Sequence, residues 1–294
     1  MSIAVIRFSA LGDIASALPY IRALREGPTL ITSGMGAGLL QDEFPDIHVL
    51  KSKRIRDVFS LVCELRKQRF DHLIDLQNND RSRLIRSLTS ARAKISSKGM
   101  PGGVPNLDNF HRIMMPSGLL QEPDTSFTPK PCDYIVLNVA SSSKWHAKRL
   151  PVAKWQQFAA LLHDRYGLPF KLTGGADERD YVAEVAAQLP GECENVAGQT
   201  SLVELKLLLR NAFLVVSTDS AAMQLAAAEK TPTIGLFGCT NWVRARPFGP
   251  WSTVLYDKAV YPDDQPPPVS IETPGAYYDG IDLADGLTAL AKFL

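Results

Sequence analysis

The sequence alternates short apolar runs with longer segments of helical periodicity, and it does so twice, on either side of a proline-rich stretch. Strands that alternate with helices are typical of a parallel sheet built from crossover connections. In the first half we predict strands at residues 3–8, 29–32 and 72–76, and helices at residues 14–25 and 55–67. The pattern therefore predicts an α/β protein with a doubly wound sheet.

The second half repeats this alternation after a break. We predict strands at residues 134–138, 170–173, 213–217 and 233–237, and helices at 152–165, 178–189, 202–210 and 220–229. The break, PSGLLQEPDTSFTPKP at residues 116–131, has prolines and polar residues but no periodicity, as in a linker. A chain of 294 residues also exceeds the usual size of one core. We therefore predict two Rossmann-like domains, residues 1–125 and 132–280, that face each other across a cleft.

The end of the chain is predicted to differ from both domains. After residue 260 the stretch YPDDQPPPVSIETPG is typical of an extended segment stiffened by proline. It leads to an amphipathic helix at residues 283–293. We expect this last segment, residues 281–294, to pack back on the N-terminal domain.

The charge balance argues against a nucleic-acid-binding protein. Acidic and basic residues nearly cancel, at a formal net charge of +1, so there is no general attraction to nucleic acid. Positive charge is still concentrated in the first half, at residues 54–69 and at Arg81, Arg83, Arg86, Arg92, Lys94 and Lys98. These groups are either solvated helix faces or a surface for an anionic acceptor or for lipid headgroups.

Cysteine spacing and hydropathy indicate the compartment. The four cysteines lie far apart and form no CxxC pair, which argues against a zinc knuckle and against a disulfide framework. The chain enters its first strand without a charged leader, and no apolar run approaches the roughly 20 residues of a membrane span. We expect a cytoplasmic protein whose contact with the inner membrane, if it has one, is peripheral.

The first polar loop, SALGDIA, follows the first strand and contains Asp13. Ligands of open parallel sheets bind at the carboxyl ends of strands, where such loops gather. Only Gly12 is present here, so the GxGxxG fingerprint of a dinucleotide site is absent. Asp13 is either the N-cap of the following helix or a general base on the floor of the cleft.

Three loops of the second half also carry polar groups after predicted strands. NVASSSKWHAKRL supplies hydroxyls and cations, which suit a phosphate group, although a polar surface loop is equally consistent. LTGGADERDYV offers acids for a ribose diol, or ordinary first-turn acids favoured by the helix dipole. STDSAAM begins a helix with small residues, a pattern typical of an anion site as well as of a simple cap.

At these loops the sequence resembles the ADP-heptose:lipopolysaccharide heptosyltransferases, which are glycosyltransferases of the GT-B architecture. Three motifs match in order: VIRFSALGDIASALPYIRALR, AKRLPVAKWQQFAALL and STDSAAMQLAAAEKTPTIGLFG. The resemblance implies an inverting transfer of a heptose or related sugar. The donor would be an ADP-sugar, the acceptor a lipopolysaccharide core or similar glycan, and no metal or other cofactor would take part.

The resemblance also implies a role for individual residues. Asp13 would be the catalytic base that deprotonates the acceptor hydroxyl, with Ser9 and Gly12 on the acceptor side. The implied donor-binding residues are Lys148 and Arg149 for the phosphates, Ser141, Ser142 and Glu178 for the ribose, Asp219, Ser220 and Ala221 for the diphosphate and sugar, and the segment from Thr200 to Leu202 for the adenine.

Two positions depart from the family pattern. Where members of the family read D-S-G-x-x-H, this chain has Ala221 in place of the glycine and Gln224 in place of the histidine. Gln cannot carry a proton or a charge at neutral pH. These departures keep open a divergent or non-catalytic protein that binds a nucleotide sugar. A Rossmann-type oxidoreductase is disfavoured because neither half has the glycine fingerprint.

Overall fold

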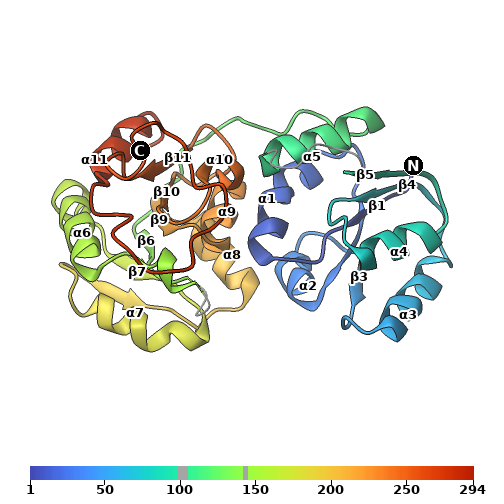
Figure 1. Ribbon diagram of the computed structural model, residues 1–294, viewed down its shortest axis with the longest axis horizontal. Coiled ribbons are helices and arrows are strands. Elements are labelled where there is room, and N and C mark those ends of the chain that lie inside the picture. Colours follow the sequence, from blue (N-terminus) through green and yellow to red (C-terminus); the bar gives the residue numbers. More distant parts are fainter. Residues whose placement is uncertain (98–104, 142–144) are drawn as a thin grey trace. The chain divides into compact units, whose positions relative to one another are not determined.

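The computed structural model describes residues 1–97, 105–141 and 145–294 (Figure 1). The chain forms two compact units, Met1–Asp124 and Thr125–Leu294. Each unit contains one sheet in which the strands pair in parallel, and helices connect successive strands. The predicted class, an α/β protein with two doubly wound sheets, is confirmed.

The first unit has a five-stranded sheet in the order β3-β2-β1-β4-β5. Its strands are β1 (Ile3–Ile6), β2 (Thr29–Ser33), β3 (Ile47–Leu50), β4 (Phe70–Asp75) and β5 (Ala91–Ser96). Its helices are α1 (Leu11–Arg22), α2 (Gly34–Leu40), α3 (Ile55–Leu65), α4 (Asp80–Leu88) and α5 (Asn106–Met114). Chain connections leave the central strand β1 toward β2 and return at β4, so the winding direction reverses between β1 and β4.

The helices of the first unit cover both faces of the sheet (Figure 1). α3 and α4 share one apolar core with the strands, to which α3 contributes Val58, Leu61, Val62 and Leu65. α1 and α5 pack together on the other face, where α2 also lies. This two-sided cover follows from right-handed crossovers, because connections that run in opposite directions along a sheet must lie on opposite faces.

The second unit has a six-stranded sheet in the order β11-β10-β9-β6-β7-β8. The strands are β6 (Ile135–Asn138), β7 (Phe170–Leu172), β8 (Cys193–Asn195), β9 (Leu214–Thr218), β10 (Thr233–Phe237) and β11 (Ser252–Tyr256). The helices are α6 (Val152–Tyr166), α7 (Arg179–Ala186), α8 (Leu202–Arg210), α9 (Ala221–Ala228), α10 (Trp242–Ala245) and α11 (Leu283–Ala289). Here the winding direction reverses between β6 and β9.

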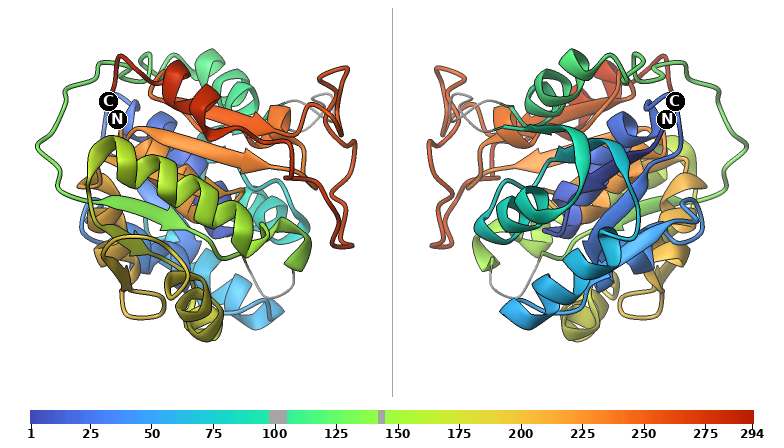
Figure 2. Two further views of the ribbon diagram at one scale, coloured as in Figure 1. Left: turned by 90° about the vertical axis from the view of Figure 1, so that its left-hand side faces the viewer. Right: turned by 90° about the vertical axis from the view of Figure 1, so that its right-hand side faces the viewer.

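The main core of the second unit lies between its sheet and three helices, α6, α7 and α11. The left view of Figure 2 shows α6 and α11 in front of the strands. Leu283, Leu287 and Leu290 are buried in this core, and α11 contacts β11. The last helix therefore uses its apolar face within the second unit, and the expectation that it also packs on the N-terminal domain stays a prediction.

The central strands differ from the edge strands in a way that explains which ones the sequence reveals. Every residue of β1, β6, β9 and β10 is buried, and apolar residues predominate in these strands. The edge strand β5 alternates half-buried and exposed residues, and β8 has no buried residue. The sequence prediction contains the seven interior strands of the two sheets and lacks the four edge strands, β3, β5, β8 and β11.

Candidate functional site

The polar loops of the second unit meet where the winding direction reverses. β6 lies between β9 and β7, with Val136 opposite Val215 on one side and Lys171 on the other. The loops that leave β6 and β9 therefore diverge to opposite faces of the sheet, and a crevice of this kind is the usual ligand site of a doubly wound fold. Residues 139–151 follow β6, and Asp219 and Ser220 follow β9.

Lys148 and Asp219 join these two loops. The Lys148 ammonium lies 2.9 Å from Asp219 Oδ2 and 3.2 Å from the backbone oxygen of the same residue. Both side chains are mostly buried, at 18% and 15% exposed. The ammonium also lies 5.4 Å from the centre of the Trp145 ring. A cation is thus held at the reversal point by charge and by a ring face.

Arg149 and Glu178 form a second ion pair beside the first. Arg149 Nη2 lies 3.4 Å from Glu178 Oε1, and the guanidinium stacks 4.3 Å from the centre of the Tyr181 ring. The other carboxylate oxygen of Glu178 accepts the Gly175 backbone N–H at 2.9 Å. Burial raises the pKa of the Tyr181 phenol, so this ring stays neutral beneath the guanidinium. The pair connects the loop after β6 to the loop after β7.

Ser220 is the N-cap of α9. Its hydroxyl accepts the Met223 N–H at 3.5 Å and the Asn138 side-chain amide at 3.0 Å. Ala221 is the first residue of the helix and presents no side chain beyond its methyl group. The first N–H groups of a helix have no partner within it, and this cap occupies only one of them. The helix start therefore retains donors for an anion.

Other predicted donor residues are placed less directly. Ser141 is buried, and its hydroxyl donates to the Trp145 carbonyl at 2.9 Å, so it shapes the loop before Lys148. Ser142 lies outside the described residues. Thr200 and Leu202 flank Ser201, the N-cap of α8, in the loop after β8. A backbone hydrogen bond of 3.1 Å from Gly198 to Gly174 ties that loop to the one after β7.

Asp13 lies at the reversal point of the first unit. It is the third residue of α1, where its Oδ2 accepts the Ala10 N–H at 2.8 Å. The alternative that Asp13 is itself the N-cap is wrong, because α1 begins at Leu11, and Ala10 is the N-cap residue. Asp13 Oδ1 lies 3.2 Å from Arg7 Nη2, and the carboxylate remains 39% exposed. It is a helix-capping group that still faces solvent.

Arg7, which holds Asp13, is itself largely buried. Burial lowers the pKa of its guanidinium, and the neighbouring carboxylates of Asp13 and Asp75 oppose that shift. The guanidinium donates to the Leu76 carbonyl at 2.5 Å, across from β1 to the end of β4. Ser9 N–H donates to Gln77 Oε1 at 3.1 Å, and Gly12 is the second residue of α1. Both predicted acceptor-side residues therefore lie at the same strand ends as Asp13.

Sequence reasoning missed two residues that organise the donor loops. Asn138, at the end of β6, donates to Ser220 and accepts the Thr173 hydroxyl at 2.9 Å, so it links three strand ends. Tyr278 donates to the Ala147 carbonyl at 3.1 Å and supports the turn that carries Lys148. An Asn at the end of the apolar run IVLN is a weak signal of this role. No local sequence pattern indicates the role of Tyr278, because its hydrogen-bond partner lies 131 residues away in the sequence.

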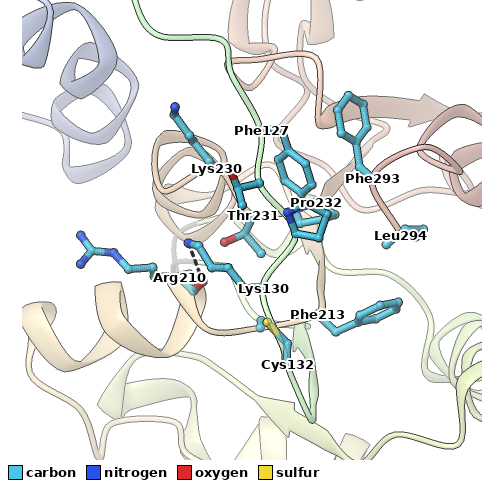
Figure 3. A pocket seen from close by; sticks show the side chains of 13 residues that line it. Phe127, Lys130, Cys132, Arg210, Phe213, Lys230, Thr231, Pro232, Phe293 and Leu294 are labelled. Carbon is cyan, nitrogen blue, oxygen red and sulfur yellow. Dashed lines mark hydrogen bonds between the residues drawn. The ribbon is translucent and has the colours of Figure 1, made fainter.

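A cavity of about 80 Å³ lies at the opposite, amino-terminal edge of the same sheet (Figure 3). Phe127 and Phe293 line it together with the cationic side chains of Lys130, Arg210 and Lys230. Arg210 is neutralised by the buried Glu229 at 2.6 Å. None of the thirteen described residues around this cavity is a predicted site residue. The cavity is therefore distinct from the loops that carry the candidate chemistry.

Comparison with known proteins gives one family. The model of glycosyltransferase family 9 (heptosyltransferase) matches residues 112–264. The lipopolysaccharide core heptosyltransferase OpsX of Haemophilus influenzae is 24% identical, over 86% of this chain and 84% of OpsX. Lipopolysaccharide heptosyltransferase 3 of Escherichia coli is 28% identical, over 67% and 68% of the two chains.

Solved structures agree on the fold. The E. coli heptosyltransferase WaaC with ADP superposes with a TM-score of 0.72 at 18% identity, covering 86% of this chain and 92% of that one. The same protein with ADP-2-deoxy-2-fluoro heptose gives a TM-score of 0.66 at 18% identity, over 87% and 93%. At this identity the likeness shows a shared fold.

Proposed function

The chain belongs to glycosyltransferase family 9, the heptosyltransferases, and from this premise we propose that it transfers a heptose from ADP-heptose to a lipopolysaccharide core. Its relatives are named for this transfer, and WaaC was solved with ADP. One observation in this chain is the main support for the proposal: Lys148, whose side chain is only 18% exposed, lies beside the start of α9 at the reversal point of the second sheet. That combination suits a diphosphate.

On the donor side, Lys148 and Arg149 contact the diphosphate together with the start of α9 at Ser220 and Ala221. Asp219, which pairs with Lys148, contacts a hydroxyl of the sugar. Glu178 and the hydroxyls of Ser141 and Ser142 contact the ribose, and the adenine lies against the segment from Thr200 to Leu202. Cations and helix N–H groups stabilise the negative charge that grows on the leaving ADP.

On the acceptor side, Asp13 takes the proton of the acceptor hydroxyl. The hydroxyl oxygen forms a bond to the anomeric carbon while the bond from that carbon to the diphosphate oxygen breaks. ADP leaves with the electron pair, and the configuration at the anomeric carbon inverts. A carboxylate oxygen is the proton acceptor that this role needs, and the Asp13 carboxylate is 39% exposed to solvent.

The direct test is release of ADP. The purified chain is incubated with ADP-heptose and a heptose-deficient lipopolysaccharide core, and ADP is measured by a coupled assay together with the mass of the product. We expect ADP and a product heavier by one heptose in equal amounts. Tight binding of ADP-heptose without ADP release, with every core tried, would instead identify a nucleotide-sugar-binding protein, the alternative suggested by Gln224 and Ala221.

We also propose that the enzyme works in the cytoplasm, at the inner face of the membrane. In the described parts of the chain, no helix combines the length and the apolar character needed to cross a bilayer. A lipopolysaccharide core is joined to lipid, so its transferase meets the acceptor at a membrane surface. The proposal is tested by fractionation: we expect the protein in the membrane pellet at low salt and in the supernatant at high salt.

A further inference from the structure

The two basic groups of the first unit differ in how their charge is compensated. In the group on α4 and β5, Arg86 lies 3.1 Å from the buried Asp75, and Arg83 lies 3.5 Å from Asp80. Lys51, Lys53 and Arg54, just before α3, are exposed and form no ion pair with any residue that the structure describes. Positive charge before α3 is therefore available to an external partner.

Exposed apolar side chains lie directly beside these cations. Ile55 is 60% exposed and Phe59 is 48% exposed, and they are four residues apart on α3, so they lie on one row of the helix. The buried face of α3 already packs on the sheet through other residues. Ile55 and Phe59 therefore contribute nothing to the core of the unit, yet each leaves a large apolar surface in water.

We call this surface the α3 patch; it consists of Lys51, Lys53, Arg54, Ile55, Arg56 and Phe59. The Arg56 side chain is 73% exposed, and its Nε lies 3.7 Å from Asp57 Oδ1. The right view of Figure 2 looks at the first unit from the side on which α3 and α4 lie. Cations that surround large apolar side chains on a helix are the pattern of a protein that binds at a membrane surface.

We propose that the α3 patch docks the protein on an anionic bilayer, with the cations against the lipid phosphates and Ile55 and Phe59 in the headgroup region. The proposal rests on the proposed function, because an acceptor joined to lipid brings the enzyme to such a surface. Lipid phosphates can pair with cations in any arrangement, whereas the carboxylates of a protein partner need a fixed one. The apolar row is also only two side chains long. A bilayer therefore fits the α3 patch better than a protein partner does. Binding of this kind is additive and strongly salt-dependent.

The test measures binding of the full chain to sedimented vesicles. We expect binding to vesicles of phosphatidylcholine with one quarter phosphatidylglycerol at least tenfold tighter than to phosphatidylcholine alone. The triple variant Lys51→Gln/Lys53→Gln/Arg54→Gln should lose about 100-fold in affinity for the anionic vesicles, because each cation near the surface contributes roughly fivefold. Ile55→Ser/Phe59→Ser should lose about tenfold, and this loss should persist at high salt.

The matched control removes three charges from the other basic group, as Arg83→Gln/Arg92→Gln/Lys94→Gln, and should lose less than threefold. A control that loses as much as the patch variant would overturn the proposal, as would equal binding to neutral and anionic vesicles. Retained binding by both patch variants would also overturn the proposal, and pull-down of a protein in place of vesicles would assign the patch to that protein partner.

Release of ADP with a core fragment freed of lipid should be unchanged in the patch variants. A protein that docks but never releases ADP would contradict the proposed function and leave the docking surface standing.

Discussion

Both sheets carry ion pairs where their winding direction reverses, but the pairs differ in how far their carboxylates are exposed. In the first unit the cation is buried and the acid faces solvent: Arg7 is 12% exposed and Asp13 is 39% exposed. In the second unit both members of each ion pair are largely buried, Lys148 with Asp219 and Arg149 with Glu178. The first edge therefore presents a carboxylate, and the second holds cations that are already paired.

This difference suits two different ligands. A carboxylate that is oriented by Arg7 and by the Ala10 N–H, yet open to solvent, can accept a proton from an incoming hydroxyl. A largely buried cation such as Lys148 can bind an anionic ligand without first being brought out of water. The same topology is thus compatible with the proposed base in one unit and the proposed diphosphate site in the other.

The largest effect is expected from Asp13→Asn, which removes the proton acceptor but keeps the shape of the side chain. Turnover should fall by about 10²- to 10⁴-fold, the usual contribution of a general base. ADP affinity, measured by calorimetry, should be unchanged, since the proposed ADP site consists of residues of the second unit. A variant that keeps the wild-type rate would show that Asp13 is not the base. The exposed carboxylate at the first edge would then have no role in the reaction.

The next effect is expected from Lys148→Ala at the other edge. Loss of a charge-assisted hydrogen bond to phosphate should weaken ADP binding by about 10- to 100-fold. The control is Lys171→Ala, which removes another lysine that is paired with a glutamate, Glu194 at 3.0 Å, from a more exposed site. Calorimetry should show little change for the control. Equal affinity of Lys148→Ala and wild type would place the diphosphate elsewhere.

The smallest effect compares the two side-chain amides that tie the strand ends together. Asn138 is buried; its side chain donates to the Ser220 hydroxyl and accepts the Thr173 hydroxyl. Gln77 is half-buried, and its side-chain oxygen accepts the Phe8 and Ser9 N–H groups. Asn138→Leu should lower the free energy of unfolding by about 2 kcal/mol, because buried hydroxyls are left without partners. Gln77→Leu should cost about 1 kcal/mol, since water reaches the freed N–H groups. Urea unfolding measures both, and a larger cost for Gln77→Leu would show that the first edge is the more tightly built.

The sequence predicted the fold well where its signal is local and strong. The helix α8 and the strand β10 have the predicted bounds, because one begins at a serine cap with Glu204 three residues on and the other is a buried apolar run. The half-exposed edge strands escaped prediction, since alternating or polar segments of three to six residues resemble loops. α1 begins three residues earlier than predicted because Asp13 caps it from its third position.

By itself the sequence determined two α/β units and the loops that carry polar groups, because periodicity and turn residues are local properties of the chain. The tertiary structure decided which of those groups meet. Lys148 pairs with Asp219 across 71 residues, and Asn138 reaches Ser220 across 82. Such pairs depend on strand order, and the order of strands is set by burial of whole helix faces rather than by any short stretch of sequence. The sequence of α11 shows that the helix has an apolar face but not which unit that face covers. In the structure the face packs in the core of the second unit.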